Sequence, residues 1–144
     1  MGDSAALMID DMGSFRIDVE VENPARPGTR REIRNVLIDT GAELSCFPAH
    51  VLEALGIART KALRLREADG SILERWSGSG IVHAAGTFTT DEVIFGEGSD
   101  LVLLGSRSLE GLNLRVDPVA KQLIDAGPMP FAGVDPQLAG HGLG

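Results

Sequence analysis

One short stretch decides the expected fold and site: Val36-Leu37-Ile38-Asp39-Thr40-Gly41-Ala42. Its apolar residues are able to form a buried strand, which ends at Asp39 just before the chain turns. A carboxylate at the end of such a strand is costly to bury unless it is hydrogen-bonded or shares its charge. Gly41 allows another backbone or a ligand to come close. The stretch therefore predicts a strand that presents one functional aspartate.

A second apolar run, Asp100-Leu101-Val102-Leu103-Leu104-Gly105, also ends in glycine. We expect the fold to place the two runs side by side. The chain has one aspartate at a suitable strand end, so a partner carboxylate has to come from a second copy. An isologous two-fold contact places the same residue opposite itself. We therefore expect two copies of Asp39 to face each other.

The composition indicates one compact domain. With 144 residues, 43% apolar residues and 18 Gly, the chain is long enough for a core and rich in turns. A net charge of −8 argues against a nucleic-acid groove or an anionic membrane surface as the main partner. The single Cys46 excludes an intrachain disulfide. The sequence shows no signal-peptide pattern and no apolar run of membrane-spanning length, so we expect a cytoplasmic location.

The rest of the chain has the pattern of short strands joined by turns. Strict alternation over residues 15–21 predicts a half-buried strand that pairs antiparallel with the strand before Asp39. Residues 49–55 and 106–113 predict two short helices. Turn chemistry between alternating segments predicts three more hairpins, over residues 63–76, 81–95 and 114–124.

These elements predict a mostly-β domain with a single core. We expect residues 13–126 to form it, after a flexible N-terminal segment of residues 1–12. Residues 127–144, rich in Pro and Gly, predict a tail that is mobile or contributes to an interface. Ser77-Gly78-Ser79-Gly80 predicts a flexible joint or a bulge, and it lacks the Gly-Lys-Ser/Thr ending of a phosphate loop.

Three parts of the chain, in this order and spacing, resemble the retropepsin-like aspartic proteases, the single-lobed family of the retroviral proteases and their bacterial relatives. The parts are Ile38-Asp39-Thr40-Gly41-Ala42, the turn Ala68-Asp69-Gly70-Ser71, and Leu103-Leu104-Gly105 before a short helix. The resemblance implies a closed β-barrel acid-protease fold with one or two short helices, active as a two-fold dimer. The chain departs from the retroviral pattern at Ser106, where those enzymes have an arginine, and has Arg107 one place later.

The resemblance also implies the chemistry of the site. In the family the aspartate of Asp39-Thr40-Gly41 is catalytic, and two such carboxylates activate one water for peptide hydrolysis. Carboxylates about 3 Å apart cannot both ionise, and aspartic proteases are the standard example of this shared proton. The resemblance implies that the Thr40 hydroxyl forms a hydrogen bond with the backbone of the partner chain. It also implies that Gly41 accepts a hydrogen bond from the substrate.

The substrate is implied to be an extended peptide, held between the floor of the site and a flap. The residues implied to contact it are Ala42, Glu43, Ala68, Asp69, Gly70, Ser71 and Leu104. The expected partners are a second copy of the chain and this peptide. No metal or other cofactor is expected. The function predicted on this basis is an aspartic endopeptidase.

Two alternatives keep the fold without the activity. The domain could be a silent binding or oligomerisation module, or a precursor whose cleft is closed by the flap or the tail. Residues 39–41 could also be an ordinary turn after a strand, where Asp and Gly are common. The sequence favours the enzyme because Asp39, Thr40 and Gly41 are all present.

Other reactive side chains give weaker hypotheses. Cys46 and His50 could form a thiol nucleophile and its base, but Pro48 between them argues against a shared helical face, and buried cysteines are usually inert. His50 and Glu53 have the helical i, i+3 spacing that a metal site could use. No HExxH motif or cysteine pair accompanies them, so a metal site is not favoured. We expect no special role for the remaining histidines, His83 and His141.

Overall fold

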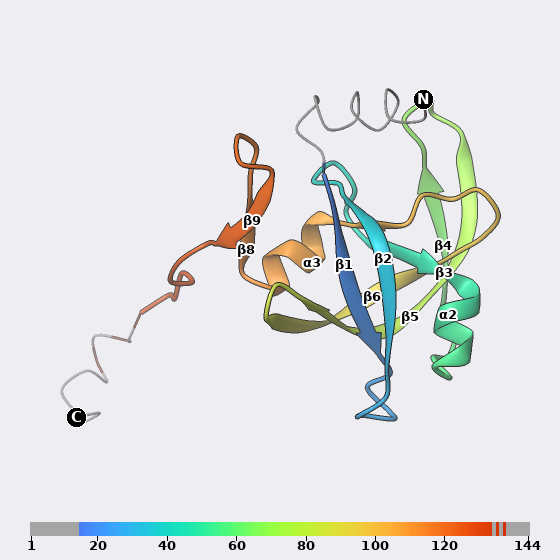
Figure 1. Ribbon diagram of the computed structural model, residues 1–144, viewed down its shortest axis with the longest axis horizontal. Helices are drawn as coiled ribbons and strands as arrows, with labels where there is room; N and C mark the ends of the chain where they lie inside the picture. Colours follow the sequence, from blue (N-terminus) through green and yellow to red (C-terminus); the bar gives the residue numbers. More distant parts are fainter. Residues whose placement is uncertain (1–14, 134, 136, 138–144) are drawn as a thin grey trace.

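The computed structural model describes residues 15–133, 135 and 137, and this part of the chain is mostly β (Figure 1). Within these residues the helices are α2 (Ala49–Ala54) and α3 (Ser106–Gly111), and neither helix is long and apolar enough to cross a membrane. The mostly-β prediction is confirmed. The strands, in chain order, are β1 (Arg16–Glu22), β2 (Arg30–Ile38), β3 (Ser45–Pro48), β4 (Lys61–Arg66), β5 (Ile72–Ala84), β6 (Thr87–Gly96), β7 (Leu103–Leu104), β8 (Leu114–Asp117) and β9 (Gln122–Asp125).

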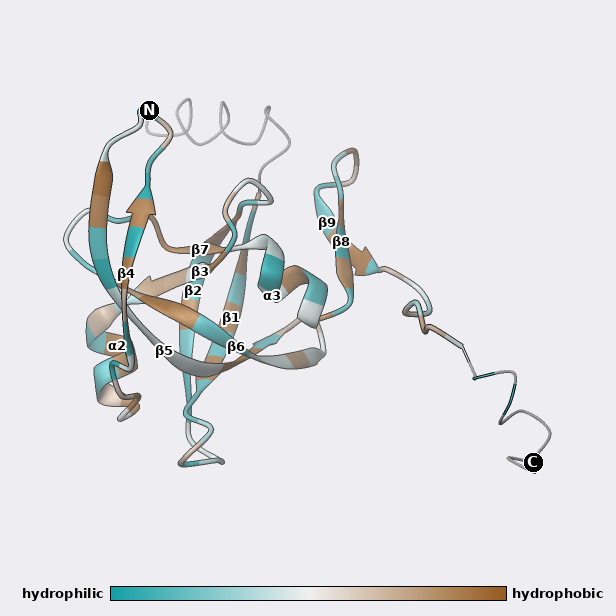
Figure 2. Ribbon diagram, turned by 180° about the vertical axis from the view of Figure 1, so that it is seen from behind, coloured by the Kyte–Doolittle hydropathy of each residue, from teal (hydrophilic) through white to brown (hydrophobic). Residues whose placement is uncertain are grey.

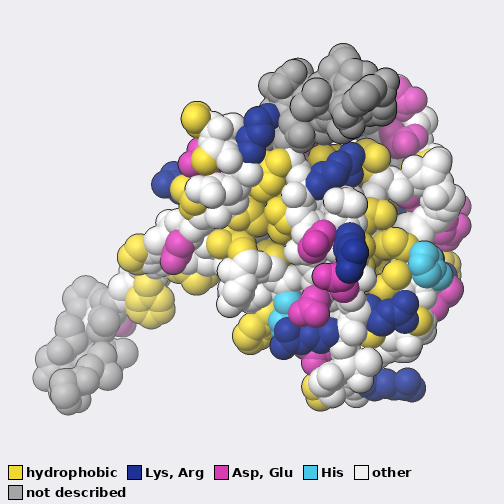
Figure 3. Space-filling model, in the orientation of Figure 1, with side chains coloured by type: hydrophobic (Ala, Val, Ile, Leu, Met, Phe, Trp, Pro, Cys, Tyr) yellow, Lys and Arg dark blue, Asp and Glu magenta, His cyan; other side chains and the backbone are white. Residues whose placement is uncertain are grey.

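Strand pairing follows the order β1-β2-β7-β3-β6-β5-β4, and β1 also pairs with β5. The hydrogen-bonded order therefore returns to its first strand, with β4 outside this ring. The hairpin of β8 and β9 is a separate two-stranded sheet. Figure 3 shows hydrophobic side chains between this hairpin and the main sheet, where Leu114, Val116 and Leu123 pack against the core.

The two apolar runs lie side by side, as the sequence predicted. Leu37 pairs with Leu103 and Ile38 with Leu104 in parallel register. The antiparallel pair of β1 and β2 and the hairpins β4–β5, β5–β6 and β8–β9 also form. The apolar runs are thus central strands, and the chain leaves the sheet where both runs end.

The core lies inside the ring of strands and is covered at one side by α2. Strand segments of high hydropathy converge on it (Figure 2). With no tyrosine in the chain, aliphatic and phenylalanine side chains fill it. Its fully buried members are Phe47, Phe95, Leu52, Leu104, Val21, Val36, Val82 and Val93.

Residues 77–80 are not the flexible joint or bulge that the sequence predicted. They continue β5 and pair with β6 in unbroken register, from Ser77 opposite Ile94 to Gly80 opposite Asp91. A Cβ at Gly78 would lie 2.3 Å from the carbonyl oxygen of Ala58, closer than any real contact. Close packing, and not flexibility, explains the glycine.

Candidate active site

Asp39 directly follows β2, at the end of the sheet where the two apolar runs stop. Its backbone N–H donates to the carbonyl of Leu104 at 3.0 Å. Its carboxylate Oδ1 accepts a hydrogen bond from the N–H of Gly41 at 2.9 Å. Asp39 is half-buried, whereas Thr40 and Gly41 are exposed. The main chain therefore fixes the carboxylate while leaving its loop open to solvent.

The Asp39 loop, residues 39–43, is anchored to the segment that joins β7 to α3. The N–H of Ser106 donates to the carbonyl of Ala42 at 2.8 Å, and the N–H of Arg107 donates to the carbonyl of Glu43 at 3.0 Å. A Cβ at Gly105 would lie 2.7 Å from the backbone of Leu44. Only glycine allows so close an approach, and residues 103–105 consequently lie directly behind the loop.

Arg107 connects the Asp39 loop to β6. Its guanidinium forms an ion pair with Glu43 and lies 3.5 Å from a carboxylate oxygen of Glu92. Glu92 in turn accepts a hydrogen bond of 2.6 Å from the hydroxyl of Ser77 in β5. Exposed ion pairs of this kind contribute about 1 kcal/mol or less each. This network could not be predicted from the sequence, because it depends on how α3 lies against the sheet.

The β4–β5 hairpin carries the predicted flap residues at its tip. Ala68, Asp69, Gly70 and Ser71 are all exposed. The hydroxyl and the N–H of Ser71 both donate to Asp69 Oδ1, at 2.6 and 2.9 Å, and these bonds lower the pKa of the Asp69 carboxyl. The hairpin and the Asp39 loop project at the same end of the molecule (Figures 1 and 2). Within the described residues, no hydrogen bond or ion pair joins the tip to that loop.

Cys46 does not have the surroundings of a nucleophile. Its side chain is buried, and this burial raises the pKa of the thiol to about 12. His50 is exposed on α2. Among the residues that the structure describes, no group of three or more His, Cys, Asp and Glu side chains is placed to hold a metal ion. The described residues therefore give no support to the thiol or the metal hypothesis.

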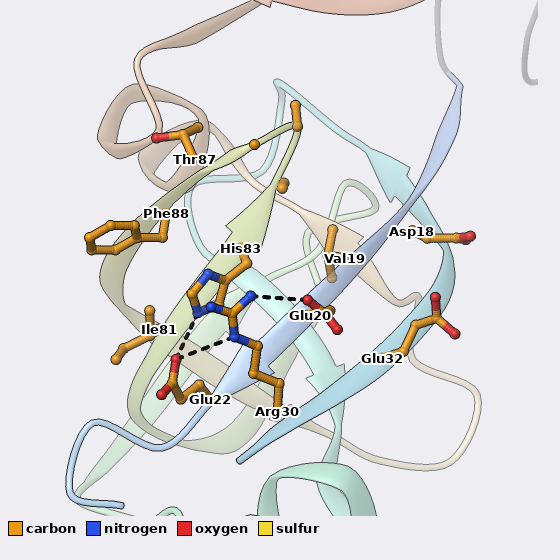
Figure 4. Close-up of a pocket in the computed structure, with 13 residues that line it drawn as sticks. Asp18, Val19, Glu20, Glu22, Arg30, Glu32, Ile81, His83, Thr87 and Phe88 are labelled. Carbon is orange, nitrogen blue, oxygen red and sulfur yellow. Dashed lines mark hydrogen bonds and ion pairs between the residues drawn. The ribbon is translucent and has the colours of Figure 1, made fainter. Parts of the chain in front are cut away.

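A hollow of about 620 Å³ lies away from Asp39, over the outer face where β1, β2, β5 and β6 meet (Figure 4). At its base, His83 Nε2 lies 2.8 Å from Glu22 Oε1. Arg30 lies 3.8 Å from Glu22 and 3.2 Å from Glu20. The N–H of Gly28, and after it the imidazole of His83, lower the pKa of the Glu22 carboxyl.

His83, for which we expected no special role, thus lies in a partly buried polar cluster. Glu22 belongs to β1 and His83 to β5, so their contact joins the first strand to the strand that completes the ring. Figure 3 shows acidic and basic side chains intermixed on this face. The contact could not be read from the sequence, because the two residues are 61 positions apart.

No family model matches this sequence, and no curated protein matches it. Among solved structures, the chain is similar to the crystal structure of a retropepsin-like aspartic protease from Rickettsia conorii. The match has 18% sequence identity, covers 72% of this chain and 82% of that chain, and has a TM-score of 0.45. A match of such low similarity assigns no role to any residue. The function therefore has to follow from this chain's own residues.

Proposed function

We propose that the protein is an aspartic endopeptidase whose active site forms between two copies of the chain. One observation carries the proposal: the Asp39 carboxylate stands at the end of a buried strand, held by the N–H of Gly41 and otherwise open. A half-buried carboxylate with a fixed orientation is suited to accept a proton from a water. The resemblance of residues 38–42, 68–71 and 103–105 to the retropepsin-like proteases supports the same chemistry.

Hydrolysis by this route requires two carboxylates in different protonation states. The ionised carboxylate takes a proton from the attacking water, while the protonated one donates to the carbonyl oxygen of the peptide. Two like charges about 3 Å apart cannot both persist, so proximity alone keeps one of the pair protonated. Within the described residues, no second carboxylate forms a hydrogen bond with Asp39, and a two-fold partner supplies one in this proposal.

The remaining predicted residues have roles in the same assembly. Thr40, exposed in one chain, bonds to the partner's loop and holds the two loops in register. Gly41 has no side chain to keep the substrate backbone away, and a Cβ there would crowd Asp39 Oδ1 at 3.3 Å. Ala42 and Glu43 form the floor. Leu104, which the sequence predicted to contact substrate, is fully buried in the core and instead packs behind the floor. The tip of the β4–β5 hairpin (residues 68–71) closes over an extended peptide and excludes water.

A silent binding module of the same fold is the second candidate, and a precursor with a blocked cleft is its variant. Three apolar side chains are strongly exposed, Val119 in the turn between β8 and β9, and Met129 and Phe131 after β9. A surface of this kind is available for contact with another segment or chain. The thiol alternative is less favoured, since Cys46 is buried and its raised pKa leaves it protonated near neutral pH.

The experiment is cleavage of a broad peptide library, from acid to neutral pH, by the wild-type protein and by Asp39→Asn. We expect the wild type to cut and Asp39→Asn to be inactive while retaining its fold and its dimer in analytical ultracentrifugation. Asp125→Asn, which changes an exposed aspartate on β9, is the matched control and should cut normally. Cleavage by Asp39→Asn, or a strictly monomeric active protein, contradicts the dyad. An intact dimer that leaves the library uncut favours the binding module.

A further inference from the structure

A line of buried hydrogen bonds lies behind the Asp39 loop and ends at a carboxylate on β6. The line includes Ser45 at the start of β3, Ser108 in α3 and Asp91 in β6. The two serines are 0% and 1% exposed. Their hydroxyls lie 2.7 Å apart, and Ser108 Oγ lies 3.0 Å from Asp91 Oδ2. Buried hydroxyls of this kind are expensive to leave without partners, so the line is a fixed part of the fold.

The other end of the line reaches the backbone of the candidate site. The N–H of Gly105 donates to Ser45 Oγ at 3.0 Å. The same peptide group carries the carbonyl of Leu104, which accepts the N–H of Asp39 at 3.0 Å. The peptide unit between Leu104 and Gly105 is rigid and planar. It therefore transmits the position of Ser45 on one side to the backbone of Asp39 on the other.

The direction of each hydrogen bond follows from the chemistry of its partners. An amide N–H only donates, so Ser45 Oγ is the acceptor from Gly105. An ionised carboxylate only accepts, so Ser108 donates to Asp91. The proton of Ser45 is then directed at Ser108. All donors, from the Asp39 amide onward, point the same way, and such chains polarise and strengthen each bond, by about 10–30% in condensed phase.

We propose that Ser45, Ser108 and Asp91 are positioning residues for the Asp39 loop. They act through the peptide unit 104–105 and touch neither substrate nor water at the site. Asp91 terminates the chain of donors and so sets its direction. The inference rests on the proposed function for its catalytic consequence, but the coupling of Asp91 to the Asp39 amide is a property of the fold alone.

The absence of a side chain at Gly105 supports this role. A Cβ there would lie 2.7 Å from the backbone of Leu44, so the peptide unit fits with little spare room between the loop and the serines. Three elements that are distant in sequence meet at this point: β3, α3 and β6. No long, flexible side chain lies between Ser108 and Asp39 along this line, so a small displacement of Ser108 is passed on to the Asp39 backbone. In catalysis, a misplacement of about 1 Å can reduce the rate about 100-fold.

The test measures amide hydrogen exchange and catalysis in Ser108→Ala, Asp91→Ala and Asp91→Asn, with Ser79→Ala as control. Ser79 is exposed on β5 and outside the line. In Ser108→Ala and Asp91→Ala we expect protection of the Gly105 and Asp39 amides to fall about tenfold, the effect of about 1.4 kcal/mol. Asp91→Asn keeps an oxygen acceptor and should retain most of the protection. Ser79→Ala should match the wild type.

Catalysis gives the second readout, with the best-cut peptide of the library as substrate. We expect kcat to fall about 10- to 100-fold in Ser108→Ala and Asp91→Ala, while KM stays within about twofold. Unchanged protection of the Asp39 amide overturns the coupling, and so do equal effects of Asp91→Asn and Asp91→Ala. If the wild type cuts no peptide, the endopeptidase proposal fails, while the exchange data still decide the coupling. If Ser108→Ala does not fold, the two Asp91 variants, at a half-buried site, carry the test.

Discussion

The Asp39 loop and the hollow over β1 and β5 differ in how they are built. The loop is held almost entirely by backbone hydrogen bonds, and its carboxylate faces an open surface. The hollow has a volume of about 620 Å³ and a cluster of ionisable side chains, Glu22, His83 and Arg30, that bond to one another. In the hollow the charged groups bond to one another, whereas among the described residues the Asp39 carboxylate has a hydrogen bond only from the N–H of Gly41. If the active site forms between two chains as proposed, concavity in one chain is a poor guide to where that site lies.

The largest difference between the two regions is expected when one carboxylate in each is neutralised. Asp39→Asn should reduce peptide cleavage by about 100-fold or more, the usual weight of a general acid or base. Glu22→Gln should leave kcat/KM within about twofold, because Glu22 touches only structural partners. Steady-state cleavage of one library peptide by both variants measures the contrast. Equal losses in the two variants would place the hollow in the active site.

A second comparison adds a methyl group at one glycine in each region. Gly105→Ala should lower the free energy of unfolding by about 1–3 kcal/mol, because its Cβ meets the backbone of Leu44. Gly86→Ala, in the hollow, should lower it by about 1 kcal/mol, since φ is +80° there but nothing lies within 4 Å. Urea unfolding at one protein concentration gives both values. If Gly86→Ala lowered the free energy of unfolding more than Gly105→Ala, backbone conformation would cost more than close packing when a side chain is added at these glycines.

The third prediction concerns acid and the Glu22–His83 contact. The pKa of the Glu22 carboxyl is lowered in the fold, so its contribution to stability is present above the ordinary carboxyl pKa of about 4.3 and is lost as the pH falls through the lower folded value. Glu22→Gln should be less stable near pH 7 and should lose less stability between about pH 5 and 3. Unfolding midpoints over this pH range measure the difference. The control is Glu32→Gln at an exposed position. Its unfolding midpoints should change with pH as those of the wild type do.

The smallest effect is expected at Cys46. Cys46→Ala removes a buried thiol that is protonated near neutral pH, so cleavage should stay within about twofold of the wild type. Activity should likewise resist a thiol-alkylating reagent applied to the native protein. If Cys46→Ala loses cleavage but keeps its fold, Cys46 is the nucleophile and the aspartic mechanism is wrong.

The parts of the molecule that the sequence predicted are those with local signals. The apolar run before Asp39, the turn at Gly41 and the hairpin tip at Asp69 and Gly70 are each encoded within a few neighbouring residues. The contact between the two apolar runs was predicted because each run leads into a glycine, but its parallel direction was not. The mostly-β class followed from alternation along the strands.

The rest depends on register and packing between distant segments. The approach of His83 to Glu22 exists only because β5 pairs with β1 as well as β6. The line from Ser45 to Asp91 needs α3 to lie across the sheet. Residues 77–80 were predicted wrongly because glycine has two physical meanings, freedom of the backbone and tolerance of a close neighbour. Only the position of Ala58 against Gly78 distinguishes them.

The return of the strand order to β1 has a consequence for how the chain folds. β1 pairs with β2 through a short connection, but its other edge is filled only when β5 has been synthesised and docked. Non-local pairing of this kind forms slowly, and an unpaired edge can recruit strands from other molecules. A nascent chain therefore exposes β1 until the segment around His83 has emerged from the ribosome. The pairing of β5 with β1, more than assembly of the Asp39 loop, is then the step before which newly made protein is most vulnerable to aggregation.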